Sequence, residues 1–129
     1  MGAFLMLACD YRVGTAGSFK VGLNETAIGM PMHSFGIEIA RYRLPKNIFN
    51  RSVINGEIFN PEMAITAGFY DMIVEADKLH ATADAIAEQF STLSMKAFSY
   101  TKVTSRKELL ALLDQCIVDD LEMEINLGD

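Results

Sequence analysis

The chain has 129 residues, of which 50% are hydrophobic, and this length suits one globular core and is too short for two. The formal net charge of -6 and the presence of only 11 Lys and Arg argue against a nucleic-acid surface, because phosphate binding needs clustered cations. The composition therefore predicts a single globular domain over residues 1–129 with no nucleic-acid partner.

The chain opens with the apolar run GAFLMLAC, which predicts a short helix from Gly2 to Cys9. No basic residue precedes the run, as one would in a signal peptide, and Asp10 ends it far short of the roughly 20 residues that span a bilayer. Because the helix would be apolar on every face, we expect it to be packed in protein all round and not to meet a membrane.

The two cysteines are Cys9, in the apolar run, and Cys116, in a run with helical character. They have neither CxxC spacing nor the pattern of a disulfide framework, so the sequence predicts two reduced thiols in the core. Reduced thiols are typical of cytoplasmic proteins, and we expect the chain to be cytoplasmic.

Short strands are expected over residues 11–14 and 19–23, because β-branched and aromatic residues flank the turn sequence TAGS. We expect these two strands to form a hairpin or a stacked pair. A helix is then expected to begin at Pro31 and to end before Pro45, since proline disfavours a helical conformation in the residue before it.

A second helix is expected over residues 46–55, closed by Gly56 as a left-handed C-cap. The sequence Asn-Pro-Glu at 60–62 predicts an N-cap followed by proline at the first helical position, in a helix that stops at Gly68. A short strand is expected over residues 69–74.

The rest of the chain is predicted to be helical. Asp77 is expected to be the N-cap of a long amphipathic helix, with apolar residues at helical spacing: Leu79, Ala83, Ile86, Ala87 and Phe90. Two further helices are expected over 94–104 and 105–121, the second opened by a capping box between Ser105 and Glu108. The acidic tail beyond them is expected to fray.

Three stretches, in order, resemble motifs of the enoyl-CoA hydratase/isomerase (crotonase) family. GAFLMLACD is similar to the family pattern G-G-x-x-L-A-x-x-C-D, and VGLNETAIG is similar to F-G-x-P-E-x-x-I-G. VINGEIFNPEMAITAGFYDMIVEADKL is similar to L-x-G-x-x-x-x-A-x-x-A-x-x-x-G-L-V-D-x-V-V-x-x-x-x-L. None of these motifs is specific alone, but their order and spacing over nearly the whole chain argue against chance similarity.

This resemblance implies an α/β fold: part of the crotonase-like (ClpP/crotonase) spiral, with short strands followed by C-terminal helices. Residues 1–74 would form the core with the active-site motifs, and residues 75–129 a C-terminal helical region. The chain begins inside the first motif, so we expect the N-terminal half of the domain to be absent. The family also implies self-association as a trimer or a pair of trimers.

The resemblance further implies an acyl-CoA substrate, whose thioester oxygen is held by two backbone N–H groups while glutamate moves a proton beside the carbonyl. Register places one donor of this oxyanion hole at Met1 or Gly2. Glu25 matches the second family glutamate, and its apolar neighbours would partly desolvate it, which suits a general acid/base. Spacing alone favours the alternative that Glu25 is a solvated loop residue.

Phe4 lies where the family has its first glutamate, and a phenyl ring cannot activate water. We therefore expect an isomerase with a single glutamate rather than a hydratase; the alternative is a non-catalytic fragment or pseudoenzyme that serves in assembly. Phe4, Met30, Pro31 and His33 are expected to contact substrate, although a capping or surface role is the commoner one for such a histidine. No metal is expected, and no cofactor beyond the coenzyme A of the substrate.

Overall fold

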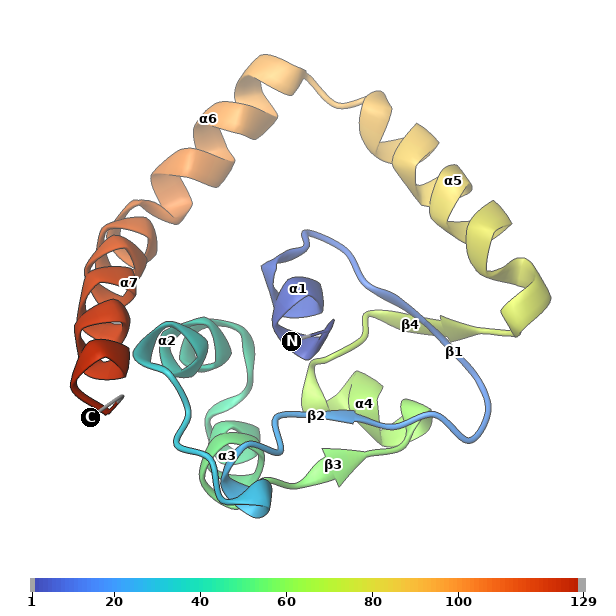
Figure 1. Cartoon of the computed structure of the whole chain (residues 1–129). Helices are drawn as coiled ribbons and strands as arrows, with labels where there is room; N and C mark the ends of the chain where they lie inside the picture. The colour runs from blue at the N-terminus through green and yellow to red at the C-terminus, as the bar shows by residue number, and fades with distance from the viewer. Residues whose placement is uncertain (1, 128–129) are drawn as a thin grey trace.

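The computed structural model describes residues 2–127, and their side chains through residue 122. A mixed α/β core is followed by a series of helices that extends around it (Figure 1). In chain order the core comprises α1 (Gly2–Ala8), β1 (Val13–Thr15), β2 (Val21–Gly22), the 3-10 turn η1 (Thr26–Ile28), α2 (Ser34–Arg43), α3 (Lys46–Phe49), the π-helical turn η2 (Asn50–Ile54), β3 (Ile58–Phe59), α4 (Pro61–Ala67) and β4 (Met72–Val74). The later elements are the 3-10 turn η3 (Ala76–Lys78), α5 (Leu79–Ser91), α6 (Met95–Ser105) and α7 (Lys107–Leu127).

The strands form two separate two-stranded sheets, so the expected pairing of the first two strands is wrong. β1 pairs in parallel with β4, with Val13 opposite Met72, and β2 pairs antiparallel with β3, with Val21 opposite Phe59. β3 was not expected from the sequence. β1 and β4 each have a partner 59 residues away in the chain, which local turn chemistry cannot indicate.

An ion pair between Arg12 and Asp71 explains why β1 lies beside β4. The Asp71 carboxylate accepts from the Arg12 backbone N–H at 2.8 Å and from Nε and Nη2 of its guanidinium, each at 2.9 Å. Arg12 Nη1 also donates to the carbonyl oxygen of Gly68. These hydrogen bonds from Arg12 hold the pKa of Asp71 below its usual value, and they fix the starts of both strands together.

The apolar core lies where α1, α2 and α4 meet the β2–β3 sheet. Phe59 and Phe69 are almost completely buried, with ring centroids 5.8 Å apart. Leu7 of α1 and Ile39 of α2 belong to the same cluster, and α7 adds Leu113. The core therefore joins elements from both ends of the described chain.

Several predicted helix ends are confirmed. The side chain of Asn60 accepts a hydrogen bond from the Met63 N–H at 2.8 Å, as an N-cap does, and Gly68 ends α4 with a left-handed φ of 87°. Gly56 is also left-handed, with φ 63°. The helix expected over residues 46–55 is instead a short α-helix that continues as the π-helical turn η2.

The predicted strand over residues 69–74 is shorter than expected. Phe69 is fully buried in the core, and regular pairing begins only at Met72. Its neighbour Tyr70 lies close to β1, where a side chain on Gly14 would come within 2.6 Å of the Tyr70 ring. Glycine at this position therefore allows the tyrosine to pack beside the strand.

The start of the later helices differs from the prediction. α5 begins at Leu79 after the turn η3, and Asp77 lies within that turn instead of capping the helix. The capping box of Ser105 and Glu108 is not formed, because Ser105 ends α6 and its hydroxyl donates to the Lys102 carbonyl. The tail that was expected to fray is helical through Leu127 in α7, and its last two residues lie outside the described residues.

α1 is much less buried than its apolar sequence implies. Leu7 is buried, but Leu5 is 65% exposed, so the expectation of packing on all sides is wrong for this chain. Cys9 is also exposed, which corrects its assignment as a core thiol, whereas Cys116 is buried. Among the described residues, no helix combines the length and the hydrophobicity required to cross a bilayer.

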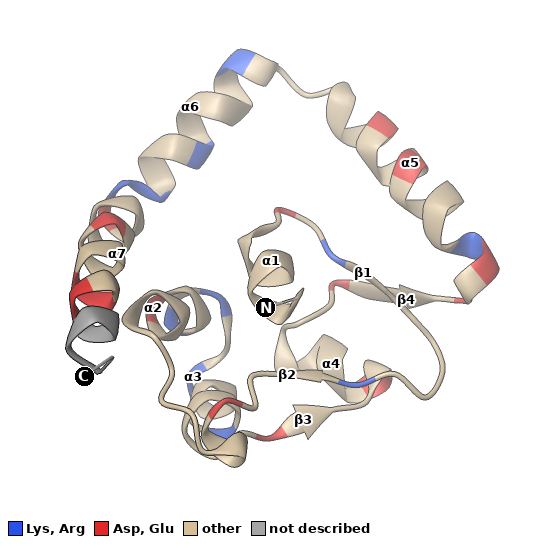
Figure 2. Cartoon of the chain, in the orientation of Figure 1, with Lys and Arg blue, Asp and Glu red and all other residues tan. Residues whose placement is uncertain are grey.

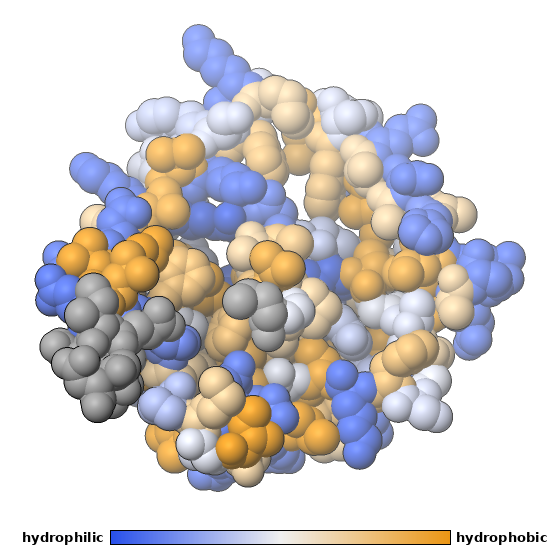
Figure 3. Space-filling model, viewed as in Figure 1, coloured by the Kyte–Doolittle hydropathy of each residue, from blue (hydrophilic) through white to orange (hydrophobic). Residues whose placement is uncertain are grey.

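The helices α5, α6 and α7 form an arm around the core, and we call residues 79–127 the arm (Figure 1). α5 packs on β1, where the rings of Tyr11 and Phe90 meet edge to face at 5.8 Å, and α7 packs along α2. α6 connects the two and has no buried residue. Apolar side chains reach the surface on the face shown in Figure 3, and many exposed ones lie on the arm: Leu93, Met95, Tyr100, Val103, Leu110, Leu112, Ile117, Val118 and Leu121.

Candidate active site

Glu25 lies in the tight turn that connects β2 to α2. Its carbonyl oxygen accepts hydrogen bonds from the Ile28 N–H at 3.1 Å and the Met30 N–H at 2.9 Å. Gly29 closes the turn with a left-handed φ of 79°, which a glycine adopts without strain. The hydroxyl of Thr26 donates to the Val53 carbonyl at 3.0 Å, which ties the turn to η2. The backbone at Glu25 is thus held by hydrogen bonds on both sides of the turn.

The Glu25 carboxylate is half-buried, which corrects the alternative of a solvated loop glutamate. Its Oε2 atom is buried without a hydrogen-bond partner among the described residues. An unpartnered buried carboxylate oxygen carries a desolvation cost, which a hydrogen bond from a bound molecule would offset. This oxygen can therefore accept a hydrogen bond from a molecule bound beside it.

Glu25 contributes to the wall of an apolar cavity of about 310 Å³. The cavity lies between α1, α2 and α7, and its lining is almost entirely hydrophobic apart from two carboxylates and an imidazole. The lining residues are Phe4, Glu25, Met32, His33, Phe35, Gly36, Ile117, Asp120 and Leu121. We call this space the acyl cavity, because an alkyl chain suits such a lining.

A second cavity, of about 300 Å³, lies on the other side of Glu25 and is more polar. It is lined by Gly2, Ala3, Met6, Tyr70 and residues 20–25. We call it the Gly2 cavity. A side chain on Gly2 would meet no atom within 4 Å, so the first described turn of α1 opens into free space. Glu25 is therefore shared by the two cavities.

The structure brings together some of the predicted site residues and not others. Glu25 and Gly2 meet at the Gly2 cavity, and Phe4 and His33 join Glu25 at the acyl cavity. Met30 and Pro31 are exposed and line neither space. The predicted oxyanion donor at Met1 lies outside the described residues.

The contribution of α7 to the acyl cavity was missed in the sequence. Ile117, Asp120 and Leu121 follow i, i+3, i+4 spacing and so lie on one face of the helix. That spacing is a signal for a shared face, but nothing local indicates that the face meets Glu25, nearly a hundred residues earlier in the chain.

Asp120 is a charged residue in an otherwise apolar environment. Its carboxylate accepts from the backbone N–H groups of Ser34, at 2.8 Å, and Phe35, at 3.0 Å. Burial alone raises the pKa of Asp120, but hydrogen bonds from these N–H groups outweigh that effect and hold the pKa below its usual value. Asp120 is therefore ionised near neutral pH, with both oxygens engaged.

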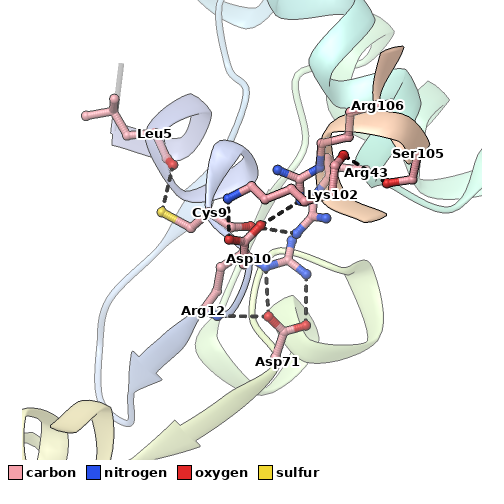
Figure 4. Close-up of polar contacts among 9 residues, drawn as sticks. All are labelled: Leu5, Cys9, Asp10, Arg12, Arg43, Asp71, Lys102, Ser105 and Arg106. Atoms are coloured by element: carbon pink, nitrogen blue, oxygen red, sulfur yellow. Dashed lines mark hydrogen bonds and ion pairs between the residues drawn. The ribbon is translucent and has the colours of Figure 1, made fainter. Parts of the chain in front are cut away.

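A second acidic anchor lies at the end of α1, away from both cavities. Asp10 accepts from Lys102 and from Arg106 at 2.7 Å, which joins α1 to α6 and to the start of α7 (Figure 4). Partial burial alone would raise the pKa of Asp10. The hydrogen bonds from Lys102 and Arg106 outweigh this effect and hold the pKa below its usual value. Figure 2 shows that α6 carries basic residues and no acidic ones. Asp10 thus has a structural role.

The described residues contain no group of three or more His, Cys, Asp or Glu side chains that could hold a metal ion. The two carboxylates of the acyl cavity, Glu25 and Asp120, are the acidic groups next to His33 in its lining.

The Enoyl-CoA hydratase/isomerase family matches residues 1–125 of the sequence. The chain belongs to this family. A solved enoyl-CoA hydratase/isomerase family protein from Pseudomonas syringae is 53% identical and superposes with a TM-score of 0.90, covering 92% of this chain and 52% of its own. The α/β crotonase-like fold is therefore confirmed.

Two curated relatives extend the comparison within the enoyl-CoA hydratase/isomerase family. Mitochondrial enoyl-CoA delta isomerase 1 of Rattus norvegicus is 28% identical over 115 residues, covering 82% of this chain and 37% of the rat protein. The fatty acid oxidation complex subunit alpha of Colwellia psychrerythraea is 37% identical over 86 residues, covering 64% of this chain and 11% of that subunit. The chain thus spans about a third of the rat isomerase and half of the solved bacterial protein.

Proposed function

We propose that this chain carries the acid/base half of an enoyl-CoA isomerase site, with Glu25 as the group that moves the proton. The observation that carries the proposal is the position of Glu25 between the two cavities, with a buried Oε2 that has no partner among the described residues. A thioester in the Gly2 cavity and its alkyl chain in the acyl cavity would bring the carbon between them to this oxygen.

The reaction needs one base. Glu25 would take a proton from the carbon next to the thioester carbonyl of a 3-enoyl-CoA, which gives a dienolate. The same carboxyl would return the proton to the fourth carbon, so that the double bond moves from carbons 3 and 4 to carbons 2 and 3. No atom is gained or lost, and no cofactor is needed beyond the coenzyme A of the substrate.

Isomerisation is favoured over hydration by the other residues around the acyl cavity. Hydration needs a second group that positions water, and Phe4 cannot do this. Asp120 is the other carboxylate in the lining, but both of its oxygens accept backbone N–H groups of α2. Among the described residues, Glu25 therefore has no second carboxylate in this cavity with an oxygen free of backbone hydrogen bonds.

The negative charge of the dienolate oxygen would be stabilised by backbone N–H groups, each worth roughly 3 kcal/mol of barrier. The Gly2 N–H, at the start of α1, is the donor that this chain would supply. We also propose that the exposed apolar side chains of the arm are covered by self-association, as a trimer or a pair of trimers, in the cytoplasm.

The test is the variant Glu25→Gln in the intact protein, assayed by conversion of 3-enoyl-CoA to 2-enoyl-CoA. We expect kcat to fall by about a hundredfold or more, because glutamine keeps the shape of glutamate but cannot carry the proton. Glu62→Gln is a matched control, since Glu62 is exposed on α4. Binding of a saturated acyl-CoA should be the same in all three proteins.

An active Glu25→Gln protein would remove Glu25 from the mechanism. Loss of acyl-CoA binding together with loss of activity would instead assign Glu25 a structural role, and the proposal would be wrong.

A further inference from the structure

Asp120 connects two helices that are far apart in the sequence. It lies on α7, 86 residues after Ser34, and its carboxylate spans the first two N–H groups of α2, from Ser34 and Phe35. The side chain is 9% exposed. Few residues of the arm are buried, and Asp120 is one of them.

The first N–H groups of a helix have no acceptor within the helix, and they form its positive end. His33 precedes α2 in the N-cap position, but its side chain makes no capping hydrogen bond. The acceptors for Ser34 and Phe35 come instead from α7. An ionised carboxylate at this end of α2 gains both hydrogen bonds and a favourable interaction with the helix dipole, which offset its burial.

The same contact determines where α7 lies relative to the acyl cavity. Ile117 and Leu121 share the face of Asp120 and line the cavity, whereas Leu113 and Cys116 are buried nearby along the same helix. Ile117 and Leu121 are themselves about half exposed, so few apolar contacts would hold them in place. Asp120 therefore adds a buried polar contact to α2 beside this part of the wall.

We propose that Asp120 is a positioning residue that seats α7 on the first turn of α2, and so fixes the wall of Ile117 and Leu121 at which the acyl chain of the substrate ends. The inference rests on the proposed acyl-CoA function. It makes Asp120 a determinant of chain length, acting through α7 and not on the reacting atoms.

The experiment measures binding of saturated acyl-CoA thioesters, from butanoyl- to dodecanoyl-CoA, which bind without reacting. In the intact protein each methylene that is buried should tighten binding about fourfold, until the chain reaches α7 and the gain stops. In Asp120→Asn this sharp limit should disappear, because the amide cannot accept from both N–H groups. Asp114→Asn makes the same change at an exposed position of α7 and should keep the limit.

Amide hydrogen exchange and a variant of the wall test the same contact independently. In Asp120→Asn, amide hydrogen exchange at Ser34 and Phe35 should be at least tenfold faster than in Asp114→Asn. Ile117→Trp leaves Asp120 in place and enlarges the wall, so the acyl-chain length at which the gain in binding stops should become shorter. If Asp120→Asn does not fold, this variant tests the inference.

The same length limit in Asp120→Asn and Asp114→Asn, or an unchanged limit in Ile117→Trp, would overturn the inference. If the unaltered protein binds thioesters with no length limit, the inference alone is wrong. If it binds no thioester of any length, the proposed function is wrong as well.

Discussion

The core and the arm are stabilised in different ways. Every member of the buried apolar cluster except Leu113 comes from residues 7–69, while α5 and α6 have no buried residue. The arm is instead tied to the core by two carboxylates: Asp10, which follows α1 and binds Lys102 and Arg106, and Asp120 of α7, which binds the start of α2. Apolar burial therefore sets the stability of the core, and a few charged hydrogen bonds set the position of the arm.

The largest effect is expected from a truncation in the core. Phe69→Ala removes a fully buried ring that packs on Phe59, and we expect the free energy of unfolding to fall by about 3–5 kcal/mol. Phe98→Ala removes the same group from α6, where the side chain is half-buried, and should cost less than half as much. Urea denaturation of both variants measures the difference; equal losses would contradict the contrast between core and arm.

A smaller effect, with a distinct pH dependence, is expected at the ion pair that joins β1 to β4. Asp71→Asn should cost about 1–2 kcal/mol at pH 7, because Arg12 loses a charged partner. The pKa of Asp71 is lowered in the folded protein, so its contribution is complete above the unfolded value of roughly 3.9 and is lost as the pH falls through the folded value.

The measurement for Asp71→Asn is the free energy of unfolding in urea between pH 7 and pH 2.5. The difference from the unaltered protein should be constant above about pH 5 and shrink at lower pH. A difference that does not change with pH would show that the charge of Asp71 contributes nothing.

The smallest effect on stability is expected at the anchor of the arm. Asp10→Asn weakens partly exposed ion pairs to Lys102 and Arg106, and should lower the free energy of unfolding by less than about 1 kcal/mol. Amide exchange in α6 should nevertheless become faster, while exchange in α2 stays the same. Asp84→Asn, at an exposed position of α5, is the control; equal exchange in both variants would exclude a role for Asp10 in holding the arm.

The parts of the fold that depend on neighbouring residues could be predicted. Asn60 caps α4 through a residue three positions away, and Gly56 and Gly68 adopt the left-handed conformations expected of helix ends. The family motifs likewise indicated Glu25 and Gly2, which the structure places around one cavity.

The rest depends on contacts between distant residues, and no local pattern shows them. The pairing of β1 with β4 rests on Arg12 and Asp71, which are 59 residues apart. The apolar run of α1 indicated burial, but hydrophobicity shows only that a surface favours a partner and not whether this chain contains it. The wall that α7 adds to the acyl cavity was missed for the same reason.

The contact between Asp120 and α2 has a consequence for biosynthesis. Ser34 and Phe35 leave the ribosome long before Asp120, and at 5–20 residues per second an interval of 86 residues takes roughly 4–17 s. During this time the first N–H groups of α2 can be satisfied only by water, and the acyl cavity lacks the wall that α7 provides. The acyl cavity is therefore completed only after the strands and α4 have been made.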